Sequence, residues 1–502
     1  MNIFETVKGA RVNKTKFNLS HERKFSMKMG KLVPILVEEV LPGDEYKINA
    51  ETMIRLAPLI SPMMHRVDAY VHFFYVPNRL VWDEWEDFIT GKENITVPQT
   101  YCEHSAAKPG SIWDYMGIPT EYQSHDLIGI NELPFRAYNK IYNDYYRDEN
   151  LQDEEPIKEI SDGDPPWKLH DRAWEKDYFT SALPWAQKGG EVEMPLNAEW
   201  SPNYHDKTKL RYTSSDVPVA NKSPLKTDSY GMITASGALA EDVYVDNLEG
   251  EQEVTGGIEI NAFRKAMALQ KWLERNARAG TRYVEHLLSH WGVKSSDARL
   301  DRAEYIGGGK SPVVISEVLN TMDDGQAPSS ALGSMAGHGI NVGKTNTAYK
   351  KVEEHGYIIG IMSVLPATTY QQGLHRGFSR QTFDDYYFPE FANLGEQEVK
   401  NKEIYFQGHN MEEMNDATFG YQSRYAEYRY KQSSVHGDFR DSLDFWHMGR
   451  KFANLPALNE DFIKADPRTD VFAVDDGTDQ LWVNLYNNIT ANRPMPYYAT
   501  PK

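Results

Sequence analysis

The sequence predicts a mainly β protein, a β-sandwich with long, partly helical insertions between its strands. Three observations support this fold class. Segments that alternate between apolar and polar residues occur near both ends of the 502-residue chain. Segments with helical spacing lie between them. A long stretch near the middle has little periodicity of either kind, which is typical of an insertion.

The first strong signal lies at residues 66–91. Residues 67, 69, 71, 73 and 75 form one apolar set with period two, so a strand is expected over 66–76. Pro77 ends it, because proline donates no ladder hydrogen bond. Trp82, Trp85 and Phe88 then recur at helical spacing before Gly91, which predicts a short amphipathic helix. These aromatic side chains are expected in the core or in a contact between subunits.

The remaining elements follow from the same rules. Strands are expected at 32–41, 46–56, 356–365, 419–430, 471–474 and 481–486, and helices after Pro134, from Asn261 to Arg278 and from Tyr283 to Trp291. The predicted organisation is a basic N-terminal arm (1–31), a first part of the sandwich (32–185), a variable surface insertion (186–257), a helical segment of that insertion (258–330) and a second part of the sandwich (331–502).

Composition is that of a globular protein, with 40% hydrophobic and 25% charged residues. The first thirty residues contain no apolar segment of the signal-peptide kind, and no apolar run is long enough to cross a bilayer, so neither secretion nor a membrane anchor is expected. Cys102 is the only cysteine, which excludes an intramolecular disulfide and a multi-cysteine zinc site. Folding in a reducing cytoplasm is therefore expected.

Charge is strongly segregated along the chain. The formal net charge is −19, yet residues 1–31 hold eight lysines and arginines against two glutamates, a net charge of +6. A nucleic-acid contact would need such a local reversal of sign. Lys8, Arg11, Lys14 and Lys16 are the residues expected to face DNA.

Tests for catalytic motifs fail. GGGKS at 307–311 and GKT at 343–345 lack the first glycine of a phosphate-binding loop. His286 and His290 lie one helical turn apart, but Leu287 stands where a zinc protease needs glutamate. No G-x-S-x-G motif occurs. No catalytic residue, metal ligand or cofactor is therefore expected, although carboxylates at glycosidase spacing cannot be recognised from sequence.

Six longer segments are distinctive when they are taken together in order. They are FNLSHERKFSMKMGKLVPILVEEVLPGDEYKI (17–48), MIRLAPLISPMMHRVDAYVHFFYVPNRLVWDEWEDFITG (53–91), ALQKWLERNARAGTRYVEHLLSHWGVKSSDARLDRAEYIGG (268–308), EHGYIIGIMSVLPATTYQQG (354–373), YYFPEFANLGEQEV (386–399) and FGYQSRYAEYRYKQSSVHGDFR (419–440). These segments resemble the major capsid proteins of the Microviridae, the shell proteins of small single-stranded DNA phages, and above all those of the gokushovirus branch. Residues 186–257 match poorly.

The resemblance implies an eight-stranded viral jelly roll and a structural role without enzymatic activity. It implies self-assembly into a T=1 icosahedral shell around a circular single-stranded DNA genome, in a virion assembled in the bacterial cytoplasm. The implied partners are copies of the chain, the genome, a small basic DNA-binding virion protein, a pilot protein and a host surface receptor, with no membrane. The insertion is implied to project at the threefold axes.

A second class of function stays open at this point. A β-sandwich with many aromatic residues also suits a carbohydrate-binding protein or a glycoside hydrolase. Sedimentation separates the two classes, because a shell protein forms large particles and a glycan-binding protein stays small.

Overall fold

The computed structural model describes residues 12–102, 106–120, 128–158, 167–189, 192, 199–212, 225–227, 233–235, 241–253, 260–280, 282–319, 335–474 and 477–498. The chain divides into two compact units. Unit 1 comprises residues 1–188 and 274–502, and unit 2 comprises residues 189–273. Within the described residues no helix is long and apolar enough to cross a membrane.

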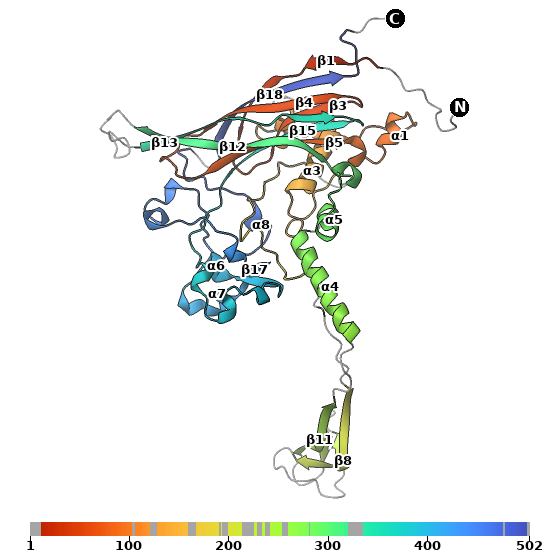
Figure 1. Cartoon of the computed structure of the whole chain (residues 1–502), viewed down its shortest axis with the longest axis vertical. Helices are drawn as coiled ribbons and strands as arrows, with labels where there is room; N and C mark the ends of the chain where they lie inside the picture. The colour runs from red at the N-terminus through yellow and green to blue at the C-terminus, as the bar shows by residue number, and fades with distance from the viewer. Residues whose placement is uncertain are drawn as a thin grey trace. The chain divides into compact units, whose positions relative to one another are not determined.

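Unit 1 is built on a curled antiparallel sheet in the order β1-β18-β4-β13-β12-β5-β15-β3, with β2 also paired to β18 and β14 to β4 (Figure 1). Its strands are β1 (Thr15–Asn18), β2 (His21–Met27), β3 (Val33–Val40), β4 (Glu45–Leu56), β5 (Val67–Pro77), β12 (Glu304–Leu319), β13 (Met335–Lys344), β14 (Ala348–Lys351), β15 (Gly356–Pro366) and β18 (Leu481–Arg493). This architecture confirms the predicted jelly-roll sandwich.

The burial patterns of the strands show how the sheet is covered. β4 and β18 alternate between buried and exposed residues, as strands with one face in the core do. β5 and β15 are buried almost throughout, because both of their faces are covered. Phe73 belongs to the core inside the sandwich, and the next residue, Phe74, belongs to a second core between the sheet and the helices. The aromatic strand at 66–76 is therefore core on both faces.

Short helices build the second core. They are α1 (Trp85–Ile89), α2 (Ile112–Met116) and α3 (Leu133–Ile141), with a hairpin of β6 (Gln99–Cys102) and β7 (Ile128–Asn131). α2 packs on β3, and α3 packs on β5 and β15. Cys102 is buried there. The helix predicted after Pro134 is thus present, and it covers the sheet.

Two parts of the predicted organisation differ from the structure. Residues 15–18 and 21–27 of the predicted arm are strands. In the second of them Phe25 and Met27 alternate into the sandwich core while Lys24 and Ser26 point outward. In the predicted helical segment 258–330, α4 (Ile260–Ala279) and α5 (Tyr283–Trp291) are helices as expected, but residues 304–319 form β12. Gly308 permits this strand, since a Cβ there would lie 2.3 Å from the carbonyl oxygen of Val71 in β5.

Unit 2 contains a four-stranded sheet of its own. Its order is β8-β11-β10-β9, with β8 (Glu199–Tyr212), β9 (Leu225–Thr227), β10 (Ile233–Ala235) and β11 (Glu241–Glu253). The polar composition of residues 186–257 concealed this pairing. Their role as a variable surface insertion stays a prediction.

The chain between β15 and β18 forms a lobe of short elements. These include β16 (Glu396–Lys400), α6 (Asn401–Ile404), α7 (Glu412–Asp416), β17 (Thr418–Ser423) and α8 (Glu460–Ile463). The strand predicted over 419–430 ends at Ser423, and residues 471–474 form only a bridge between Leu59 and Phe472. We call residues 370–430 of this region the aromatic lobe.

Candidate functional site

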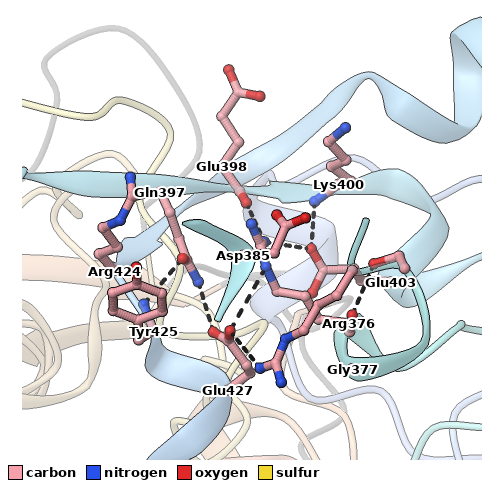
Figure 2. Close-up of polar contacts among 12 residues, drawn as sticks. Arg376, Gly377, Asp385, Gln397, Glu398, Lys400, Glu403, Arg424, Tyr425 and Glu427 are labelled. Atoms are coloured by element: carbon pink, nitrogen blue, oxygen red, sulfur yellow. Dashed lines mark hydrogen bonds and ion pairs between the residues drawn. The ribbon is translucent and has the colours of Figure 1, made fainter. Parts of the chain in front are cut away.

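Two arginines and two glutamates form a buried ion network in the aromatic lobe (Figure 2). Arg376 Nη1 donates to Glu403 Oε1 at 2.9 Å and to the backbone oxygen of Glu398 at 2.7 Å. Arg380 Nη2 donates to Glu427 Oε1 at 3.1 Å. The side chains of Glu403 and Glu427 are only 4% and 3% exposed. Charges this deeply buried are stable only when they are paired and hydrogen-bonded.

Neutral donors complete the coordination of both carboxylates. Glu403 accepts from the Tyr178 hydroxyl at 2.9 Å and from the backbone N–H of Lys400 at 3.0 Å, while Glu427 accepts from Gln397 Nε2 at 2.9 Å. Burial raises the pKa of Glu403 above its ordinary value, and the positive charge of Arg376 opposes that rise. The network therefore fixes the segments that carry these residues.

The strand pair β16 and β17 positions the two glutamates. Gln397 and Val399 are the inward residues of β16, so Gln397 reaches Glu427 from inside the lobe. Tyr425 follows β17 with a left-handed backbone (φ +62°), and its N–H donates to Gln397 Oε1 at 3.0 Å. This turn directs Glu427 into the network instead of toward solvent.

The same segments carry a dense set of exposed apolar side chains. Phe378 is 82% exposed. The other exposed large apolar residues of the lobe are Phe383, Tyr386, Tyr387, Phe388, Leu394, Phe406, Met411, Met414, Tyr428 and Tyr430. Exposed apolar side chains that are this frequent in one region are typical of an interaction site on a folded protein.

Ring contacts connect many of these side chains. Phe391 lies 6.1 Å from Phe383 and 6.0 Å from Phe388 between ring centroids. Tyr387 lies 6.2 Å from Tyr428, and Arg380 stacks on Tyr428 at 4.5 Å. Arg380 therefore links the exposed rings to the buried ion network.

An open hollow of about 700 Å³ lies in the same lobe. Tyr370 and Phe378 line it together with polar groups that include Arg376 and Glu403. Tyr370 is buried, whereas Phe378 protrudes at the rim. The lobe thus offers both protruding rings and a recess, the two features that a packed protein contact needs.

The arrangement is suited to binding a partner. Each carboxylate of the network is engaged by an arginine and by neutral donors. Among the described ranges, no group of three or more His, Cys, Asp or Glu side chains could hold a metal ion. What the lobe provides is a rigid, apolar, aromatic surface.

The helix predicted around Trp82, Trp85 and Phe88 is shorter in the structure, because α1 covers only Trp85–Ile89 and Trp82 precedes it. The three aromatic side chains pack in or against the second core. Trp82 is 6% exposed, and its ring lies 5.1 Å from that of Phe88 and 6.0 Å from that of Trp85. Trp85 and Phe88 are partly buried against the same core, and Trp85 also contacts His355 at 5.6 Å. Of the two roles predicted for these residues, the structure places Trp82 in the core. A subunit contact of Trp85 and Phe88 stays a prediction.

The structure describes only two of the four residues that are predicted to face DNA. Lys8 and Arg11 lie outside the described residues. Lys14 Nζ donates to Glu45 Oε1 at 2.8 Å, so part of its charge is neutralised. Lys16 is an exposed residue of β1, opposite Asn492 of β18. Contact of these residues with DNA stays a prediction.

Sequence reasoning assigned no role to the aromatic lobe. The signal was present in YYFPEF at 386–391, where four aromatic side chains fall in six residues without strand or helix period. Apolar residues that fit neither period cannot all face one core. Such a run is therefore better explained by a contact surface than by a buried element.

The chain is similar to known proteins over almost its whole length. A family described as "Capsid protein (F protein)" matches residues 5–502. Capsid protein VP1 of Bdellovibrio phage phiMH2K is 37% identical over 528 residues, which cover 99% of this chain and 97% of the relative. Capsid protein VP1 of Chlamydia phage 1 is 35% identical over 587 residues (100% and 97%), and that of Spiroplasma virus 4 is 31% identical over 547 residues (99% and 97%).

Proposed function

The chain belongs to the capsid protein (F protein) family and is a structural capsid protein, and on that premise we propose that its copies assemble into a small icosahedral shell around a circular single-stranded DNA genome. The shell would assemble in the bacterial cytoplasm. Partners in the virion would be a small basic DNA-binding protein and a pilot protein. A host surface receptor would bind from outside.

The observation that supports subunit assembly is the aromatic lobe. Two of its exposed rings, Tyr386 and Tyr428, lie against Arg380, which the buried ion network holds in place. A rigid aromatic surface loses little conformational entropy when a partner covers it, and Tyr and Trp are enriched at the centres of protein contacts. The partner that a capsid protein must meet is a second copy of itself.

Assembly is tested with a double variant, Phe378→Ser and Phe383→Ser. Both side chains are strongly exposed, so we expect the subunit to stay soluble and folded. Loss of the two rings removes apolar area from the contact, and we expect the variant to sediment as a small species while the unaltered chain forms large particles. Analytical ultracentrifugation measures this difference.

The matched control is Tyr101→Ser on β6, a half-exposed aromatic outside the lobe. We expect it to assemble normally. Assembly of the double variant into particles would remove the lobe from the contact. Failure of the unaltered chain to form any large particle would contradict the proposal that it assembles into a shell.

The basic segment is proposed to contact the genome from inside the shell. Its support is the net charge of +6 over residues 1–31 in a chain of −19. Replacing Lys8, Arg11, Lys14 and Lys16 with Ser should reduce genome retention and leave empty shells able to form. If about four cations pair with phosphates, single-stranded DNA binding should fall with salt at a log–log slope near −3. Unchanged retention in purified particles would show that this charge has another role.

A further inference from the structure

One face of the sandwich is left open by the described residues. On β4 the residues at odd positions point away from the core, and their neighbours on β18, β2, β1, β13 and β14 share that face by register. We call this the open sheet face. Its residues are Lys16, Asn18, Glu22, Lys24, Ser26, Glu45, Lys47, Asn49, Glu51, Met53, Arg55, Ile340, Val342, Lys344, Tyr349, Lys351, Trp482, Asn484, Tyr486, Asn488, Thr490 and Asn492.

The open sheet face is positively charged although the chain is acidic. It carries six lysines and arginines against three glutamates, a net charge of +3, in a chain of net charge −19. Each of the three glutamates is bonded to a lysine: Glu22 to Lys24 (2.8 Å), Glu45 to Lys14 (2.8 Å) and Glu51 to Lys344 (2.7 Å). The carboxylates are therefore largely neutralised by neighbouring cations.

Other cations on this face keep their charge available. Lys47, Arg55 and Lys351 are exposed, and the hydrogen bonds and ion pairs of the described part of the chain include none for these side chains. Lys351 lies opposite Glu45 across the β14–β4 pair and attracts that carboxylate, so Lys47 and Arg55 are the cations with the most available charge. An exposed cation without a paired carboxylate attracts an anion from outside the subunit. The face thus has the electrostatic character of a site for a polyanion.

Aromatic rings stand beside these cations. Trp482 is 46% exposed and lies directly opposite Arg55 across the β18–β4 pair. Tyr349 is 54% exposed and lies opposite Lys47. Tyr486, on the same face of β18 as Trp482, is 38% exposed. Exposed rings next to cations on a sheet are the combination with which proteins hold unpaired nucleotides, since bases stack on the rings and phosphates meet the charges.

We propose that the open sheet face binds single-stranded DNA without sequence preference. Bases stack on Trp482, Tyr486 and Tyr349, and phosphates pair with Arg55, Lys47 and Lys351. A duplex would meet the same charges but offers no free base face to the rings. The proposal rests on the proposed function only because that function identifies single-stranded DNA as the enclosed genome. It names a second DNA-binding surface besides the basic segment at residues 1–31.

The experiment uses the full-length unassembled subunit and an oligothymidine of about 20–30 nucleotides, with binding followed by fluorescence anisotropy at several salt concentrations. We expect Trp482→Ala to weaken binding about five- to a hundredfold, the effect of one lost base stack. Trp482→Phe keeps a ring and should retain most of the affinity. The combined variant Arg55→Ser and Lys47→Ser should make the log–log salt slope shallower by about 1.4, since two phosphate contacts are lost.

Matched controls lie away from the face. Trp291→Ala removes an exposed tryptophan of α5, and Arg429→Ser removes an exposed arginine of the aromatic lobe. Both should bind the oligonucleotide as the unaltered subunit does. Equal unfolding midpoints for all variants show that none of these effects comes from misfolding.

Three outcomes would overturn the proposal. They are no binding by the unaltered subunit, unchanged binding by Trp482→Ala, and equal affinity for a duplex of the same length. Assembly of the same variants is measured separately by sedimentation. Variants that bind DNA normally but no longer assemble would show that a second copy covers this face, which also overturns the proposal. Failure of the unaltered chain to form shells would contradict the proposed function, whereas the binding result on the subunit would stand.

Discussion

Replacing Arg376 with methionine is expected to lower the free energy of unfolding by about 3–5 kcal/mol, the usual cost of removing one partner from a buried ion pair. Methionine keeps much of the side-chain volume but removes the guanidinium. Glu403, 4% exposed, would then be buried without its cation. Denaturant unfolding of the unassembled subunit, followed by fluorescence, measures the loss.

The pH dependence of the variant identifies the cause. Without Arg376, only the hydrogen bonds from Tyr178 and the Lys400 N–H still oppose the rise that burial produces in the pKa of Glu403, so this pKa rises further. A carboxyl whose folded pKa lies above its unfolded value contributes stability that is fully present below the unfolded pKa, about 4.3, and is lost as pH rises through the folded pKa. The difference between variant and unaltered chain should therefore shrink as pH falls toward 4.

The control is Arg429→Met, which removes an exposed arginine from the same lobe. Its side chain donates to Ser423 Oγ at 2.5 Å and to the backbone oxygen of Arg424 at 3.1 Å, both in exposed positions. We expect a change within about 0.5 kcal/mol. An equal loss in both variants, or a loss at Arg376 that does not vary with pH, would show that the network is not held by charge.

The sequence was most informative where local periodicity reports burial. The helix over Tyr283–Trp291 has the predicted bounds, and α4 differs from its prediction by one residue at each end. The strand at 66–76 was recognised because its apolar residues alternate. These signals depend on residues a few positions apart, so one sequence contains them in full.

The pairing of strands that are far apart in sequence cannot be predicted from local periodicity. β12 lies between β5 and β13, and its partner Val71 is more than two hundred residues away in sequence. The segment 304–319 contains three adjacent glycines at 307–309 and offers little period to detect. Its place in the sheet depends on close backbone approach at Gly308, which is a tertiary property.

The buried ion network and the open sheet face could not be predicted from the sequence for a related reason. Arg376 and Arg429 stand in similarly polar sequence, yet one is buried between two glutamates and the other is exposed. The open sheet face combines residues from both ends of the chain, with Arg55 opposite Trp482. The net charge of successive sequence segments identifies the basic arm. It cannot identify a surface that strand pairing assembles from distant segments.

The second large effect is expected at Trp82, which precedes α1 in the second core. Trp82→Ala is expected to cost about 3–5 kcal/mol of unfolding free energy, because an almost fully buried ring leaves a cavity among Trp85, Phe88 and the helices of the second core. Reduced solubility of the expressed subunit would accompany a loss of this size. Denaturant unfolding of the soluble fraction measures it.

Trp85→Ala is the matched comparison, because the same residue type lies three positions away with a partly exposed ring. We expect a loss of about 1–2 kcal/mol, since less apolar area leaves water on folding at this site. If Trp85 contacts a second copy, its variant should remain soluble and folded but fail to form particles in sedimentation. Losses in the reverse order would contradict the placement of Trp82 in the core. Normal assembly by Trp85→Ala would leave Trp85 as a packing residue of the subunit, with the aromatic lobe as the surface on which copies meet.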